Sequence, residues 1–305
     1  MIANQIISEF SSPLLLRESA NQIAHMIYLN AKNHQHSNIT AIGAPKIPKL
    51  HANMICSDDV DCDSDPFASY QEGSVVILPI IGMMFKYNCI DWDEYRYVIG
   101  MDTIANLIRQ ADASPNIAGT ICLQNTPGGS TQSIYQMEDA LRKRKKPNLT
   151  LVDGMSCSGG VYVSSFSDEI WATNRMCEIG SIGTFAKVLD DSKYMENLGL
   201  KVISVYPPES SWKNKEIRTL LSTGDEKPMI DDKLTPFALH FQNIVKSNRP
   251  NLDLTVEGIL EGREFYAYDA VKNGLIDGIM NIDQAVERVQ QMAQEQKQLY
   301  SQFKN

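Results

Sequence analysis

The sequence predicts an α/β domain with a largely parallel sheet, because strand-like and helix-like segments alternate from residue 74 onward. A second observation supports this fold class: two glycine-bearing loops, "NTPGGS" at 125–130 and "SCSGG" at 156–160, each follow a strand-like segment. In open parallel sheets the reactive loops lie at the carboxyl ends of the strands. We therefore expect both glycine loops to lie at that edge of the sheet.

The strand-like segments are apolar runs, which are typical of buried strands. They are "SVVILPII" at 74–81, "IAGTICLQ" at 117–124, "LTLVDG" at 149–154, "EIWAT" at 169–173 and "KVISVYPP" at 201–208. Segments at 91–113, 130–144 and about 189–198 lie between them and predict helices. In the second of these, Ile134, Met137 and Leu141 share one helical face.

The last part of the chain predicts three helices. Thr235 as N-cap and Pro236 at the first position begin a long amphipathic helix with Phe237 and Phe241 along one side. The segment "YAYDAVKNG" predicts a short helix closed by Gly274, with "LIDGI" after it. The tail "IDQAVERVQQMAQEQKQLYSQFKN" predicts a polar final helix.

These patterns divide the chain into three regions. Residues 1–70 form an N-terminal extension that we expect to be partly ordered, with one helix at about 17–32. Residues 71–285 form the main domain, and residues 286–305 form a C-terminal helical tail. The extension contains "CSDDVDCDSD" at 56–65, which lacks the ligand order of a calcium loop and therefore predicts an acidic loop.

Composition narrows the function classes. The 305-residue chain has a net charge of -9, which argues against a nucleic-acid-binding surface. Its basic run "RKRKK" at 142–146 falls at a predicted helix end, where cations complement the helix dipole. The apolar run at 74–85 is too short to span a bilayer, and no secretory signal is visible, so we expect a cytoplasmic protein. The six cysteines show no C-x-x-C spacing, and we expect neither a metal nor a cofactor.

The two glycine loops suggest acyl-transfer chemistry, which needs a nucleophile, a proton acceptor and donors for the oxyanion. Ser158 fits the role of nucleophile, and the amides of Gly159 and Gly160 would face the reacting carbonyl. The loop "TPGG" would present further amides from the neighbouring strand end. Each loop taken alone is also compatible with an ordinary turn, and neither matches a phosphate-binding motif.

The proton acceptor is harder to identify from the residues. Four of the five histidines lie in the N-terminal extension, and His240 adjoins the apolar face of a helix, where a structural role is expected. A lysine can act instead when its surroundings favour the neutral amine. The candidates are Lys213 and Lys215, in "SSWKNKE" after the segment 201–208.

Four segments, in order, resemble the signal peptide peptidase A-like serine peptidases, which share the Clp protease and crotonase fold. They are "LQNTPGGS", "CSGGVYVSSFSDEIWATNRMCEIGSIGTF", "YMENLGLKVISV" and "LEGREFYAYDAVKNGLIDGI", and the resemblance covers about 74–285. It implies a superhelical βαβ fold with a largely parallel sheet. It also implies that 71–285 is a serine peptidase domain acting on polypeptides.

The resemblance assigns roles to individual residues. It implies that Ser158 is the nucleophile, and that Gly129 and Gly159 are the oxyanion donors, with Gly128 supporting the turn. It implies a catalytic lysine a few residues past the segment 201–208, which is Lys213 in "SSWKN", with Lys215 as the fallback. In this family the serine and the lysine can come from adjacent subunits of a ring-like homo-oligomer.

Within the family, the absence of an anchor and the polar extension favour the branch from phages and prophages that cuts scaffold and capsid proteins during head assembly. Such a protein would work in the host cytoplasm or the immature phage head. The alternatives are a signal-peptide-degrading peptidase of the same family and a catalytically inactive assembly or scaffold-binding subunit. A crotonase-type acyl-CoA enzyme would explain the oxyanion loops but would leave the pairing of Ser158 with Lys213 unused.

Overall fold

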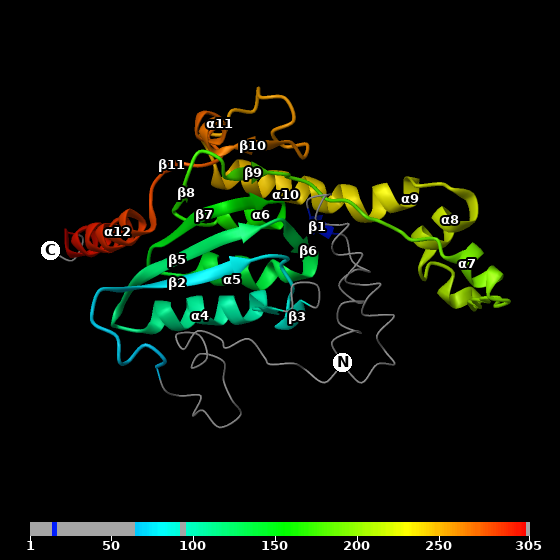
Figure 1. The fold of residues 1–305 in the computed structure, drawn as a ribbon, viewed down its shortest axis with the longest axis horizontal. Helices are drawn as coiled ribbons and strands as arrows, with labels where there is room; N and C mark the ends of the chain where they lie inside the picture. Colours follow the sequence, from blue (N-terminus) through cyan, green and yellow to red (C-terminus); the bar gives the residue numbers. More distant parts are fainter. Residues whose placement is uncertain (1–13, 17–64, 92–95, 303–305) are drawn as a thin grey trace.

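The computed structural model describes residues 14–16, 65–91 and 96–302. Its centre is a seven-stranded sheet in which all neighbours run parallel except β10, which is antiparallel to β9 (Figure 1). The central path is β10-β9-β7-β5-β2, and β8 and β11 extend the sheet from β7. The strands are β2 (Ser74–Ile81), β5 (Ile117–Thr126), β7 (Asn148–Cys157), β8 (Glu169–Ala172), β9 (Glu178–Gly180), β10 (Glu264–Tyr266) and β11 (Gly278–Ile279).

Strand β7 divides the sheet, because its two halves pair with different neighbours on the same side. Its first half, from Leu149 to Val152, pairs with β8, whereas Met155–Cys157 pairs with β9. The sheet therefore opens into a fork at the end of β7. The residue that follows Cys157 lies at this fork, at the carboxyl end of the strand.

Helices cover both faces of the sheet. One face packs against α4, α5, α6 and α10 in a large apolar core, and the other packs against α12 through Ala285 and Val289. The helices are α4 (Met101–Ala113), α5 (Tyr135–Lys143), α6 (Gly159–Ser164), α7 (Ser192–Asn197), α8 (Lys215–Thr223), α9 (Lys227–Met229), α10 (Thr235–Asn248), α11 (Ala267–Lys272) and α12 (Ile282–Gln302). None of the helices in the described part of the chain has the length and apolarity needed to span a bilayer.

Two short pairs of strands lie outside the central sheet. Strand β3 (Cys89–Asp91) pairs with β4 (Arg96–Val98), and β1 (Leu14–Leu16) pairs with β6 (Gly128–Ser130), both in antiparallel orientation. The predicted helix at 91–113 is therefore too long: residues 96–98 form a strand, and the helix begins only at Met101, after Gly100. The apolar spacing of "YRYVIG" is compatible with either structure, and pairing with β3 decides between them.

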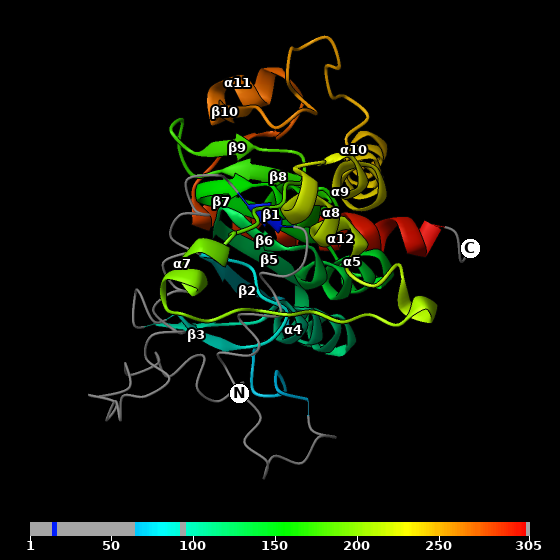
Figure 2. The ribbon, with the colours of Figure 1, turned by 90° about the vertical axis from the view of Figure 1, so that its right-hand side faces the viewer.

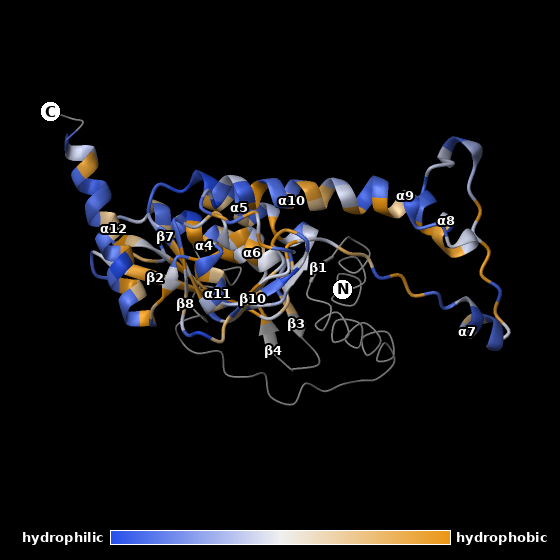
Figure 3. Ribbon diagram, turned by 90° about the horizontal axis from the view of Figure 1, so that it is seen from above, coloured by the Kyte–Doolittle hydropathy of each residue, from blue (hydrophilic) through white to orange (hydrophobic). Residues whose placement is uncertain are grey.

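Residues 185–233 leave the body of the molecule as an arm that carries α7, α8 and α9 (Figures 1 and 3). The arm is closed at its base by a hydrogen bond from Thr184 Oγ1 to the carbonyl of Leu234. The strand predicted at 201–208 falls on this arm and is wrong, because residues 201–207 have no regular secondary structure. Val202, Ile203 and Val205 are 70%, 72% and 86% exposed, so this apolar segment joins no sheet among the residues that the structure describes.

Four of the five segments predicted to be strands are strands in the structure. The segments at 74–81, 117–124, 149–154 and 169–173 are strands, as predicted, and Gly274 follows α11. Thr235 is not an N-cap, because a π-helical turn at Ile230–Leu234 leads directly into α10 and gives Thr235 helical backbone angles. The helix predicted at 17–32 lies outside the described residues, as does the acidic loop predicted at 56–65 except for its last residue, Asp65.

The basic run at 142–146 ends α5, as predicted, but its side chains have specific partners. Arg142, Lys143 and Arg144 form ion pairs with Glu138 at 2.8 Å, Asp139 at 2.6 Å and Asp168 at 2.7 Å. The Arg144 side chain is only 11% exposed, and Lys146 Nζ donates to the carbonyls of Ala111 and Ser114. This run therefore fastens α5 to the strands and to α4.

The contact of β5 with α12 yields a stability prediction. A Cβ atom at Gly119 would lie 2.5 Å from the carbonyl oxygen of Pro147 and 2.6 Å from Val289 Cγ1, so α12 can approach β5 only at a glycine. We expect Gly119→Ala to lower the free energy of unfolding by about 1–3 kcal/mol, the usual cost of overpacking. Urea denaturation followed by circular dichroism would measure it.

Gly183→Ala is the matched control, because a Cβ atom there would meet nothing within 4 Å. We expect it to change the free energy of unfolding by less than about 0.5 kcal/mol. Equal stabilities of the two variants would contradict this account of the contact between β5 and α12.

Candidate active site

Ser158 occupies a strained turn between β7 and α6. Its backbone angles are φ 52 and ψ -114, a combination that L-residues with a side chain adopt rarely. The turn is fixed by the Ser158 amide, which donates to the Gly180 carbonyl at 2.8 Å. Strain of this kind is stored where the surrounding structure over-determines the conformation, and it concentrates at functional sites.

The Ser158 hydroxyl is buried and makes no hydrogen bond to the described residues. The residue is 1% exposed, and its Oγ has no hydrogen-bond partner among the residues that the structure describes. A serine before a helix commonly caps it by accepting from a backbone amide, but the Ser158 side chain makes no such bond to α6. Because buried polar atoms are nearly always paired, this oxygen is a candidate for a role in chemistry rather than in folding.

A buried polar network supports the turn from within the sheet. Ser156 Oγ donates to Gln124 Oε1 at 2.6 Å, and Gln124 Nε2 donates to the Gly160 carbonyl at 3.4 Å. Both side chains are fully buried. Gln124 and Ser156 therefore position the start of α6, a role that was not predicted for either residue. The feature of the sequence that points to such a role is a polar residue, Gln124, directly after the apolar residues of the strand "ICLQNT".

The second glycine loop forms β6. The Gly128 amide donates to Thr126 Oγ1 at 3.1 Å, and that hydroxyl donates to the Gly82 carbonyl at 2.6 Å. A Cβ atom at Gly129 would lie 2.0 Å from the carbonyl oxygen of Met84, so the close approach of these two backbones requires glycine. The loop is thereby held rigid, with its main chain presented at the end of β5.

The structure brings the two loops together. Thr126 and Ser156 are register partners on β5 and β7, and β6 contacts α6. Ser158, Gly159, Gly128 and Gly129 therefore lie at one edge of the sheet, the edge formed by the carboxyl ends of the strands. Such an arrangement can offer a hydroxyl nucleophile and backbone donors to one carbonyl group.

The candidate lysines lie elsewhere. Lys213 is exposed, and Lys215 Nζ lies 3.6 Å from the centroid of the Trp212 ring. Both belong to the arm, whose helix α8 begins at Lys215 and lies at the end of the molecule away from α6 (Figures 1 and 3). Within one chain, the structure does not bring either lysine to Ser158.

His240 contacts Tyr162. Its Nε2 lies 3.0 Å from the hydroxyl oxygen of Tyr162, and that hydroxyl donates to Glu138 Oε2 at 2.6 Å. Burial, together with the hydrogen bond to Glu138, raises the pKa of Tyr162 well above its ordinary value. Tyr162 lies on α6, so the cluster ties the helix that follows Ser158 to α5 and α10.

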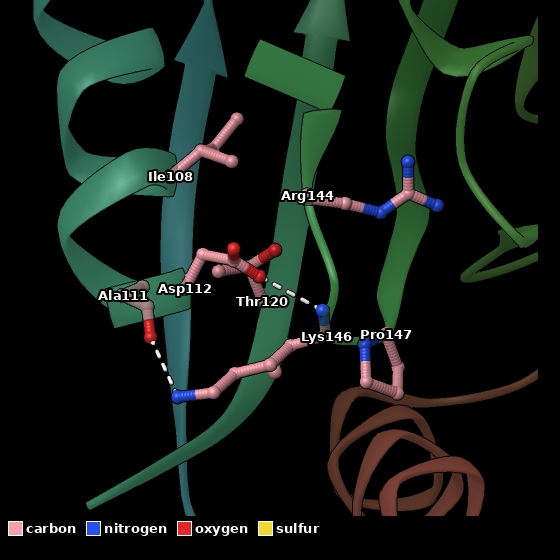
Figure 4. Close-up of a pocket in the computed structure, with 8 residues that line it drawn as sticks. Ile108, Ala111, Asp112, Thr120, Arg144, Lys146 and Pro147 are labelled. Carbon is pink, nitrogen blue, oxygen red and sulfur yellow. Dashed lines mark hydrogen bonds between the residues drawn. The ribbon is translucent and has the colours of Figure 1, made fainter. Parts of the chain in front are cut away.

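A small pocket lies at the opposite edge of the sheet (Figure 4). It is lined by Ile108, Ala111, Asp112, Gly119, Thr120, Arg144, Lys146 and Pro147, at the amino ends of β5 and β7. In the close-up, the Lys146 side chain donates to the Ala111 carbonyl, and the Lys146 amide donates to Asp112. The pocket therefore belongs to the structural anchor of the basic run and is separate from Ser158.

Comparisons with known proteins give one family model and several relatives that are described as proteases or peptidases. The model of peptidase family S49 matches residues 140–297. Protease 4 of Haemophilus influenzae is 28% identical over 214 residues, covering 68% of this chain and 34% of that protein. A putative signal peptide peptidase SppA of Enterococcus faecium is 28% identical over 172 residues, covering 53% of this chain and 47% of that protein.

More distant matches extend the comparison. Capsid assembly protease C of Escherichia phage lambda is 22% identical over 232 residues, covering 72% of this chain and 49% of that protein. The chain thus spans between about a third and a half of these three relatives. Among solved structures, a mutant of the 1510-N membrane-bound stomatin-specific protease aligns at 15% identity with a TM-score of 0.42, covering 71% of this chain and 84% of that one.

The cluster around Tyr162 gives a prediction that needs no knowledge of the substrate. We expect Tyr162→Phe to lower the free energy of unfolding by about 1–3 kcal/mol, because it removes a buried donor from Glu138. Tyr135→Phe, at a position that is 70% exposed, is the matched control and should be neutral. Chemical denaturation of both variants measures the difference, and a neutral Tyr162→Phe would show that the hydroxyl has no anchoring role.

Proposed function

Because the chain belongs to peptidase family S49, we propose that it is a serine endopeptidase in which Ser158 is the nucleophile and Lys213 is the proton acceptor. The observation that carries the proposal is the Ser158 hydroxyl, which is buried, unpaired among the described residues and held on a strained turn. Ser158 belongs to one of the two glycine loops, and β7, which leads into it, is paired with β5 and β9. A purely structural serine at a strand-to-helix turn would normally cap the helix instead.

The proposed reaction follows the general course of acyl transfer. Neutral lysine takes the proton from Ser158 Oγ as this oxygen attacks the carbonyl carbon of the scissile peptide bond. The amides of Gly129 and Gly159, with Gly128 supporting the turn, donate to the oxyanion that forms. The resulting lysine ammonium returns its proton to the leaving amine as the C–N bond breaks. The same lysine then takes a proton from water as the water oxygen attacks the ester carbonyl, and it gives that proton to Ser158 Oγ as the C–Oγ bond breaks.

The position of the lysines supports an assembly in which the arm of one copy reaches the body of another. Lys213 lies on the arm, whereas Ser158 lies in the body, so a dyad shared between subunits requires a homo-oligomer. The exposed segment with Val202, Ile203 and Val205 supplies the apolar surface that such an interface would bury. A subunit interface also supplies the dry surroundings that favour a neutral lysine.

We further propose that the substrates are scaffold or capsid polypeptides in phage or prophage head assembly. This rests on the name of the phage lambda relative, which is described as a capsid assembly protease. The Enterococcus relative, described as a putative signal peptide peptidase, favours the degradation of signal peptides as the second candidate. Incubating the assembled protein with each substrate class and identifying the products by mass spectrometry would discriminate the two.

The nucleophile can be tested by covalent labelling. A fluorophosphonate probe should label the assembled wild-type protein, and Ser158→Ala should abolish both labelling and peptide hydrolysis. Ser164→Ala is the matched control, because Ser164 is a buried serine in the helix that follows Ser158, and its hydroxyl donates to the Val161 carbonyl of that helix. Absence of labelling in an assembled wild-type oligomer would favour a catalytically inactive assembly or scaffold-binding subunit.

The proton acceptor is tested by two substitutions that lie two residues apart. We expect Lys213→Ala to abolish turnover, with folding and assembly retained, because the exposed side chain is not needed for packing. Lys215→Ala should keep most of the activity, since its ammonium group lies over the Trp212 ring. Hydrolysis rates and sedimentation of both variants provide the measurement. The reverse result would move the role to Lys215.

Mixing two inactive variants tests whether the dyad is shared. Ser158→Ala and Lys213→Ala subunits, unfolded and reassembled together at equal concentration, should regain about a quarter of the wild-type activity if each site takes its two residues from different copies. A dyad formed within one chain would give no recovery in the mixture.

A further inference from the structure

The strand β6 has two hydrogen-bonding edges, and the chain itself occupies both. On one edge the Met84 amide donates to the Gly128 carbonyl at 2.8 Å, and the Ser130 amide donates to the Met84 carbonyl at 3.2 Å. The other edge pairs with β1, which comes from the N-terminal region (Figures 1 and 2). The register partners are Leu14 with Ser130, Leu15 with Gly129 and Leu16 with Gly128.

Strand β1 differs from the other strands of the fold. It takes no part in the seven-stranded sheet, and within the described residues it forms a two-stranded sheet with β6 alone. It is three residues long and pairs with a loop more than a hundred positions away in the sequence. A short extended segment added to a free strand edge is the geometry by which proteins bind peptides through β-augmentation.

The edge that β1 occupies adjoins the candidate nucleophile. Strand β6 contacts α6, which begins directly after Ser158, and Gly129 is opposite Leu15 in the register. Two of the three β6 residues that pair with β1 are glycines, so this edge offers main-chain groups and little side-chain selection. An extended polypeptide approaching Ser158 along β6 would need the same main-chain groups that β1 now uses.

We propose that Leu14–Leu16 is an internal peptide ligand, which occupies the substrate-binding edge of β6 and must leave before a substrate strand can bind. This inference rests on the proposed function, because it takes the edge beside Ser158 to be the one that receives substrate. The substrate class that follows is an extended polypeptide segment that binds β6 through its main chain, with little selection by side chain. The N-terminal region then competes with substrate for the site.

The test compares Leu15→Pro with Leu15→Ala in the full-length protein. Proline has no amide hydrogen and fits poorly into a ladder, whereas alanine keeps the backbone groups that pair with β6. In Leu15→Pro, hydrogen exchange of the peptide containing Gly128–Ser130 should become faster, while Leu15→Ala should match the wild type. Leu15→Gly, which keeps the amide but weakens the strand, provides the same readouts with a smaller change if Leu15→Pro fails to fold.

A binding measurement gives the size of the effect. Fluorescence anisotropy with a labelled "SPLLLRES" peptide, on a Ser158→Ala background, should show about tenfold tighter binding to Leu15→Pro than to Leu15→Ala if β1 occupies the edge in about nine of ten molecules. On the wild-type background, KM should fall by the same factor, with kcat unchanged. Equal exchange and equal peptide binding in the two variants would overturn the internal ligand.

The two proposals fail in different ways. Exchange and binding on the Ser158→Ala background need no catalysis, so they report on β1 even if the protein hydrolyses nothing. Differences in exchange and binding without any hydrolysis would support the internal ligand and reject the protease. Normal hydrolysis, together with equal exchange and equal peptide binding in Leu15→Pro and Leu15→Ala, would reject the internal ligand and support the protease.

Discussion

The hydrogen bond from the Ser158 amide to the Gly180 carbonyl is the interaction on which the site depends. It continues the pairing of β7 with β9 for one residue past the end of the strand, at the point where β7 has already separated from β8. The chain is thereby forced into the left-handed region at a residue that carries a side chain. The sheet supplies the free energy that holds this conformation, because β7 lies at its centre and is paired on both sides.

The polar network below the turn completes this constraint. Gln124 on β5 and Ser156 on β7 are buried polar residues that hydrogen-bond to each other, and Gln124 also donates to the Gly160 carbonyl. These two neighbouring strands are therefore linked by side chains as well as by their backbones. On the far side, Tyr162 ties α6 to Glu138 and His240. Ser158, the proposed nucleophile, is therefore followed by a helix that is held at Gly160 and at Tyr162, and preorganised catalysis requires a rigid environment of this kind.

The sequence was informative wherever the structure is local. Apolar runs predicted β2, β5, β7 and β8, and the positions of the glycine loops relative to the strands placed Ser158 and Gly129 at one edge. The same reasoning failed for residues 201–208, because an apolar pattern indicates a preference for burial and does not identify the surface that provides it. It also could not find Gln124 as a positioning residue or β1 as the partner of β6, since both depend on contacts between segments distant in the chain.

The arm has a consequence for how the protein behaves at different concentrations. Its apolar side chains, such as Val205, are exposed to solvent on a single chain, which is an unfavourable state that burial against another copy would relieve. Under the proposed mechanism, a newly made chain at low concentration would be a monomer, in which Ser158 on the body and Lys213 on the arm are apart. Hydrolysis would then begin only once enough copies had accumulated to associate, so other polypeptides would not be cleaved while the protein was dilute.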